Sequence, residues 1–141
     1  MRILVVAGAL IALMFSSSAH SEVRITYDEG GSITAYVARY NFIRDSGESV
    51  VIDGVCLSAC TLVVGIVPPE RVCVTRNAFL GFHAARRSFQ GIQFVSDSAT
   101  TDLMSHYPPK LRSWLNRRGG LGEDLVFLDE RSMSSMIKRC R

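Results

Sequence analysis

The spacing of apolar and polar residues predicts an alternation of strands and helices along the chain. Residues 23–27 alternate with a period of two and are rich in β-branched and aromatic residues, so we expect a strand there. After a turn at 28–32, apolar residues at 33, 36, 37, 40 and 43 recur with the period of a helix. A short buried strand is predicted at 49–52.

The same pattern continues through the second half of the sequence. A turn at 53–57 and a helix at 58–64 are followed by Pro68-Pro69 and by two predicted strands, 71–74 and 78–82. Further elements are then expected in the order helix, helix, strand, at 94–107, 110–118 and 125–128. Strand and helix in alternation predict a single α/β domain of repeated β-α-β units with a mainly parallel sheet.

The first 21 residues have the pattern of a secretory signal peptide. Arg2 supplies a positive charge, residues 3–15 form an apolar run, and residues 16–21 are mostly small and polar. The run is shorter than the roughly 20 residues that span a bilayer, which makes an uncleaved anchor the second interpretation. We expect cleavage after Ser21, with Ala19 nearly as suitable, no membrane-spanning segment afterwards, and a mature domain at 22–141. The predicted location is periplasmic or secreted.

The mature part is long enough for one domain with one core. Without Arg2 the basic residues exceed the acidic ones by only two, a balance that gives no support to nucleic-acid binding. All four cysteines lie in this part of the chain: Cys56, Cys60, Cys73 and Cys140. Exported proteins keep disulfides, so we expect bridges, in any of three complete pairings, rather than a metal site.

Two polar residues follow predicted strands, at the carboxyl ends where α/β sheets bind ligands. Ser58 follows the predicted strand 49–52 at the start of a helix, where unpaired backbone N–H groups can hold an oxyanion and a hydroxyl can attack a carbonyl. By this motif alone Ser58 is better explained as a helix N-cap. His83 ends an apolar strand, where a histidine is more often structural than catalytic. If both lie at the carboxyl ends of neighbouring strands, they mark a ligand site.

Three short motifs together resemble the proteolytic subunit of the Clp protease, in the Clp/crotonase superfamily. Gly30-Gly31-Ser32-Ile33-Thr34-Ala35 is similar to its Gly-Gly-Ser-Val-Thr-Ala segment, and Gly54-x-x-x-Ser58 to its nucleophile turn. Residues 71–74 leading to Gly81-Phe82-His83 are similar to the strand pair that ends in its histidine. The 25-residue interval from Ser58 to His83 agrees with that family, and the resemblance covers residues 23–83.

The resemblance implies a fold and a set of roles. It implies a minimal Clp/crotonase-like fold in which Ser58 is the nucleophile and His83 the general base. The N–H groups of Gly31 and Ala59 would form the oxyanion hole. The triad acid would fall at Glu130 or Asp129, with Asp102 a less favoured stand-in. No cofactor and no metal are implied.

The leading hypothesis is a small exported Clp-like serine hydrolase that acts on a peptide or another acyl compound through an acyl-enzyme on Ser58. No ATPase partner is expected outside the cytoplasm, whereas assembly into a homo-oligomer agrees with such scaffolds. The alternative is a catalytically inactive binding or assembly protein, in which the Ser58 hydroxyl caps its helix. A redox protein using Cys56 and Cys60 is third, because reactive redox pairs usually have two intervening residues rather than three.

Overall fold

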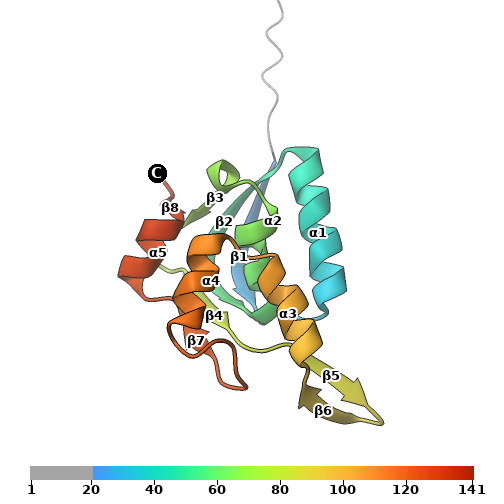
Figure 1. Ribbon diagram of the computed structural model, residues 1–141. Helices are drawn as coiled ribbons and strands as arrows, with labels where there is room; N and C mark the ends of the chain where they lie inside the picture. The colour runs from blue at the N-terminus through green and yellow to red at the C-terminus, as the bar shows by residue number, and fades with distance from the viewer. Residues whose placement is uncertain (1–20) are drawn as a thin grey trace, which may run out of the picture.

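The computed structural model describes residues 21–141 and shows one α/β layer built on a mostly parallel sheet (Figure 1). The predicted signal peptide lies outside the described residues, apart from Ser21. The elements are β1 (Glu22–Asp28), α1 (Ile33–Ser46), β2 (Ser49–Leu57), η1 (Ser58–Leu62), α2 (Val63–Ile66), η2 (Pro69–Arg71), β3 (Val72–Val74), β4 (Phe79–Phe82), β5 (Arg86–Phe89), β6 (Ile92–Val95), α3 (Asp97–Ser105), α4 (Pro109–Asn116), β7 (Val126–Phe127), α5 (Glu130–Met136) and β8 (Lys138–Arg139).

Strand β2 organises the sheet, because it pairs in parallel with β1, β3 and β4. Strand β8 adds to β3 in parallel, and β7 is the antiparallel strand of this sheet, next to β4. The predicted α/β class and mainly parallel sheet are therefore confirmed. The core lies between this sheet and the helices and includes Tyr40 of α1, Ile52 of β2 and Leu115 of α4, all fully buried.

Strand β2 is longer than the sequence pattern predicts, since 53–57 is part of the strand and not a turn. Gly54 explains the difference. A Cβ atom at this position would lie 1.9 Å from the carbonyl oxygen of Thr26, at the point where the β1–β2 register shifts. The glycine therefore allows two strands to approach closely at a bulge, a role that a sequence pattern does not separate from a turn.

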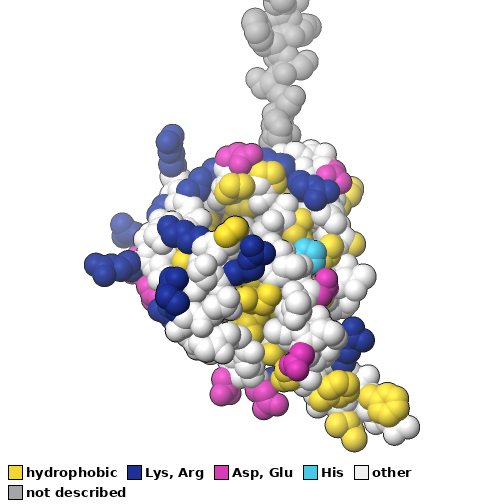
Figure 2. Space-filling view, in the orientation of Figure 1, with side chains coloured by type: hydrophobic (Ala, Val, Ile, Leu, Met, Phe, Trp, Pro, Cys, Tyr) yellow, Lys and Arg dark blue, Asp and Glu magenta, His cyan; other side chains and the backbone are white. Residues whose placement is uncertain are grey.

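The predicted helix at 94–107 begins later, because a β-hairpin occupies its first residues. Strands β5 and β6 are joined by Gln90 and Gly91, both with positive φ, as in a two-residue hairpin turn. Ser96 then caps α3 by accepting a hydrogen bond from the amide of Ala99. The hairpin projects from the body of the molecule (Figure 1), and hydrophobic side chains gather on it (Figure 2). Phe89, Ile92 and Phe94 are its exposed large hydrophobic residues.

Two disulfides are formed, Cys56–Cys60 and Cys73–Cys140, and no cysteine of the described part is free. Two bridges fit a protein of an oxidising compartment, as expected for an exported chain. Within residues 21–141, none of the helices has the length and apolar character needed to cross a membrane.

Candidate functional site

The turn from β2 into η1 holds Ser58 in an unusual backbone conformation. Its φ is 55°, in the left-handed region that residues other than glycine rarely occupy. The N-cap position of η1 belongs to Leu57, and no side chain caps this helix. The interpretation of Ser58 as an N-cap is therefore wrong, and the structure gives its hydroxyl no hydrogen bond to another described residue.

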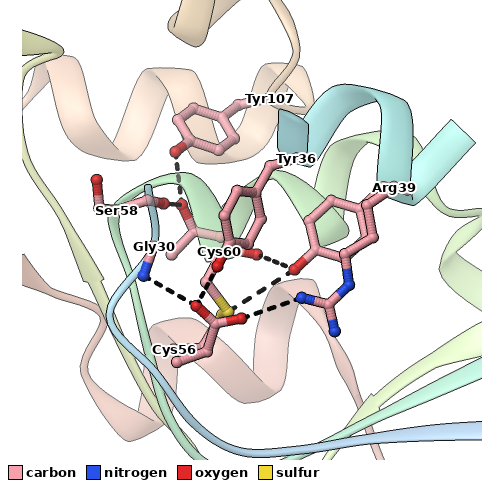
Figure 3. The surroundings of a disulfide bond; sticks show 10 residues. Gly30, Tyr36, Arg39, Cys56, Ser58, Cys60 and Tyr107 are labelled. Atoms are coloured by element: carbon pink, nitrogen blue, oxygen red, sulfur yellow. Dashed lines mark hydrogen bonds and ion pairs between the residues drawn. A yellow bond between two sulfur atoms is a disulfide. The ribbon is translucent and has the colours of Figure 1, made fainter. Parts of the chain in front are cut away.

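Contacts from several elements hold this turn in place (Figure 3). The disulfide Cys56–Cys60 joins the residues two before and two after Ser58. The Thr61 hydroxyl donates to the Ser58 carbonyl at 2.6 Å and accepts from the Tyr107 hydroxyl at 2.6 Å. Burial raises the pKa of Tyr107, so its phenol stays protonated and remains a donor.

The loop after β1 packs against the same turn. Gly30 has φ 85°, and a Cβ atom on it would lie 2.6 Å from the Leu57 carbonyl oxygen and 2.8 Å from the Ala59 nitrogen. Only glycine allows this approach. Gly31 is less crowded, because its nearest neighbour would be Tyr36 at 3.5 Å. Gly30 is thus adjacent to the Ala59 amide of η1, and Gly31 is its neighbour in the chain.

Asp28, which belongs to none of the sequence motifs, fixes that loop. Its carboxylate accepts hydrogen bonds from the Gly30 amide at 2.9 Å and the Tyr36 hydroxyl at 2.5 Å, and Arg39 lies at 3.3 Å (Figure 3). Burial, followed by the bond to Asp28, raises the pKa of Tyr36 to about 12. The phenol therefore remains a donor at neutral pH. Tyr36 and Arg39 stand three residues apart on α1 and therefore lie on the same face of the helix. That spacing is common in helices, so it does not reveal from the sequence that both side chains contact Asp28.

His83 follows β4, the parallel neighbour of β2. Leu57 pairs with Gly81 in the β2–β4 register, so Ser58 and His83 both leave the carboxyl ends of adjacent strands. The His83 Nδ1 lies 2.6 Å from the Ala84 carbonyl oxygen. Since a carbonyl only accepts, this contact favours the tautomer with the proton on Nδ1 and leaves Nε2 as the acceptor.

Ser58 and His83 line one cleft of about 730 Å³. Gly31 and Asp102 also line it, the latter from α3, and β5 contributes Arg87. Among the described residues, no hydrogen bond joins the Ser58 hydroxyl to the His83 ring. Such contacts are often long in a free enzyme and shorten when substrate binds.

The two favoured acid candidates make other contacts and are not among the residues that line the cleft. Asp129 is the N-cap of α5 and accepts from the Ser132 amide at 2.8 Å, which, with the Ser132 hydroxyl, lowers the pKa of its carboxyl. Glu130 is exposed and pairs with Arg139 at 2.9 Å. Asp102, the less favoured stand-in, is the acid candidate that shares a cleft with Ser58 and His83.

The backbone of Ser58 provides a direct test of this turn. A left-handed conformation costs a residue other than glycine roughly 1–2 kcal/mol, and glycine has no such cost. We expect Ser58→Gly to have a free energy of unfolding about 1 kcal/mol higher than Ser58→Ala, as measured by urea denaturation. Both variants remove the hydroxyl, so no hydrogen bond of the serine side chain contributes to their difference, which reports the cost of a Cβ atom at this backbone conformation. Equal stabilities would show that the turn is not held in the left-handed region.

Comparison with known proteins identifies the fold and not a family. No family model and no curated protein matches this sequence. Two solved structures are similar over 86% of this chain and 79% of their own. One is described as an enzyme (TM-score 0.54, 9% identity) and the other as a peptidase from Plasmodium falciparum (TM-score 0.52, 8% identity). At these identities the similarity establishes a shared α/β fold.

Proposed function

We propose that this chain is a small exported serine hydrolase of the Clp-like type, which acts on a peptide or another acyl compound. The observation that carries the proposal is the conformation of Ser58. Ser58 has a positive φ, its hydroxyl makes no hydrogen bond to another described residue, and it lines a cleft that also contains a histidine. This backbone conformation is costly for a structural serine and useful for a nucleophile. The peptidase among the similar structures and the two disulfides support the same assignment.

The proposed mechanism gives each of these residues one role. The Ser58 Oγ attacks the substrate carbonyl while the His83 Nε2 accepts its proton. The N–H groups of Gly31 and Ala59 stabilise the negative charge that develops on the carbonyl oxygen. The imidazolium then gives the proton to the leaving group, and water releases the acyl group from Ser58 by the reverse sequence.

The Ala84 carbonyl can hold the imidazole tautomer that a triad carboxylate usually selects. We assign stabilisation of the imidazolium to Asp102, because it lines the same cleft. Asp129 and Glu130 stay candidates from the resemblance, and each requires a rearrangement that frees its carboxylate. When substrate enters, the His83 imidazole approaches Ser58 and forms the hydrogen bond that the mechanism requires.

Labelling with a serine-directed fluorophosphonate tests the proposal. We expect the oxidised wild-type protein to be labelled, and Ser58→Ala and His83→Ala to lose labelling by at least about 10³-fold. Ser134→Ala and His106→Ala are matched controls, since neither residue lines the cleft. Asp102→Asn should slow labelling more than Asp129→Asn, if the cleft carboxylate is the functional one.

A folded wild-type protein that is not labelled would contradict the proposal. It would favour the alternative, a catalytically inactive binding or assembly protein on the same scaffold. One observation favours that alternative, namely the missing hydrogen bond between Ser58 and His83 among the described residues. Titration with short peptides, followed by the fluorescence of Trp114, would then measure binding without chemistry.

A further inference from the structure

The Cys56–Cys60 disulfide joins the two residues that flank the candidate nucleophile, Ser58, at a distance of two positions on either side. Ser58 is the central residue of the five-residue segment that the bridge closes. Both cysteines are fully buried, and Cys56 belongs to β2 while Cys60 lies in η1. The bridge therefore ties the end of the strand to the helix that follows and spans only the turn.

The surroundings of the bridge limit how the turn can move. The buried Tyr40 of α1 donates a hydrogen bond to the Cys60 carbonyl at 2.9 Å, with its oxygen 3.8 Å from the Cys60 sulfur (Figure 3). On the strand side, Cys56 pairs with Asp28 in the β1–β2 register, and Asp28 holds the Gly30 amide. Both halves of the proposed site, the serine turn and the glycine loop, thus meet at this bridge.

The second bridge has a different setting. Cys73 and Cys140 are 67 residues apart, join β3 to the residue after β8, and are both partly exposed. Neither cysteine is among the residues that line the cleft. A short bridge at the turn and a long bridge at the β3–β8 edge of the sheet provide a built-in comparison.

We infer that the Cys56–Cys60 disulfide is a positioning element, which holds Ser58 in the left-handed conformation needed to present its hydroxyl to the cleft. This inference rests on the proposed function for its catalytic meaning. The bridge takes no part in the chemistry. It restricts the two residues on either side of the serine, so that the strained turn does not relax into an ordinary strand-to-helix connection.

The first experiment measures labelling by the fluorophosphonate probe at a temperature where all variants are folded. Cys56→Ala/Cys60→Ala should be labelled about 10²-fold more slowly than wild type, the effect of a displacement of roughly 1 Å in a reacting group. The control Cys73→Ala/Cys140→Ala should keep the wild-type rate. Equal rates for wild type and Cys56→Ala/Cys60→Ala would overturn the inference while leaving the proposed function intact.

The second experiment does not depend on activity. With the bridge present, Ser58→Gly should melt about 4 °C above Ser58→Ala, because only glycine avoids the cost of positive φ. In the Cys56→Ala/Cys60→Ala background the two variants should melt together, since the turn is free to relax. A difference that persists without the bridge would show that the rest of the fold holds the turn, and the inference would fail even if labelling is observed.

A third variant covers the case in which the bridge-free protein does not fold. Tyr40→Phe keeps the buried ring and removes only the donor to the Cys60 carbonyl. It should slow labelling about tenfold, with the wild-type KM for a short ester substrate and a lower kcat. An unchanged kcat would contradict the inference.

Discussion

Cys73→Ala/Cys140→Ala is expected to lower the free energy of unfolding by about 4 kcal/mol. In the chain-entropy account, the stabilisation by a disulfide increases with the length of the loop that it closes, and this bridge joins residues 67 positions apart. It also attaches β8, which pairs with β3 through only two residue pairs. For a domain of this size the loss is a large share of a total stability of about 5–15 kcal/mol. Urea denaturation of the oxidised proteins measures it.

The matched variant is Cys56→Ala/Cys60→Ala. The short loop between these residues gives a smaller entropic term, about 2 kcal/mol by the same account. The order of stability should therefore be wild type, then the variant without the short bridge, then the variant without the long one. The reverse order would contradict the entropic explanation. The two bridges are expected to separate stability from activity, since the one that matters less for stability is the one beside Ser58.

The sequence predicts the order of the main strands because their apolar runs are short and bounded by turn residues. The mainly parallel sheet follows from strands and helices that alternate. The hairpin at β5 and β6 was missed because its residues, among them Phe89 and Ile92, are exposed on both faces and pair only with each other. Such strands carry no burial pattern to detect. Strand β8, which forms only two residue pairs with β3, and the short helix α5 were also missed, because elements this short leave little pattern in the sequence.

The candidate site is predictable in part for a similar reason. Ser58, Gly31 and His83 belong to short motifs whose order along the chain carries information, and the fold places all three at one cleft. The triad acid would come from a distant segment with no local motif, so the sequence favours Asp129 and Glu130 over Asp102, whereas Asp102 is the one of these three that lines the cleft. Asp28 was missed because its partners, the Gly30 amide and Tyr36, are brought together only by the packing of α1.

Substitution of the two adjacent glycines should separate folding from activity. Gly30→Ala is expected to reduce stability by at least about 2 kcal/mol, because the new methyl group would lie 2.6 Å from the Leu57 carbonyl oxygen and the residue would keep a positive φ. The loop or the serine turn must move to relieve that contact. Since the Ala59 amide and the Ser58 Cβ are both within 2.8 Å of the same methyl group, we expect probe labelling to fall by about 10²-fold or more.

Gly31→Val is the informative partner of that variant. Only Tyr36 would lie near its Cβ, at an ordinary contact distance of 3.5 Å, so the domain should unfold at nearly the wild-type urea concentration. Its branched side chain would nevertheless crowd the amide that we assign to the oxyanion hole, and labelling should be slow in a fully folded protein. Wild-type labelling of Gly31→Val would remove Gly31 from the mechanism. Normal stability of Gly30→Ala would show that the glycine loop does not pack against the serine turn, and the proposed oxyanion hole would lose its geometric basis.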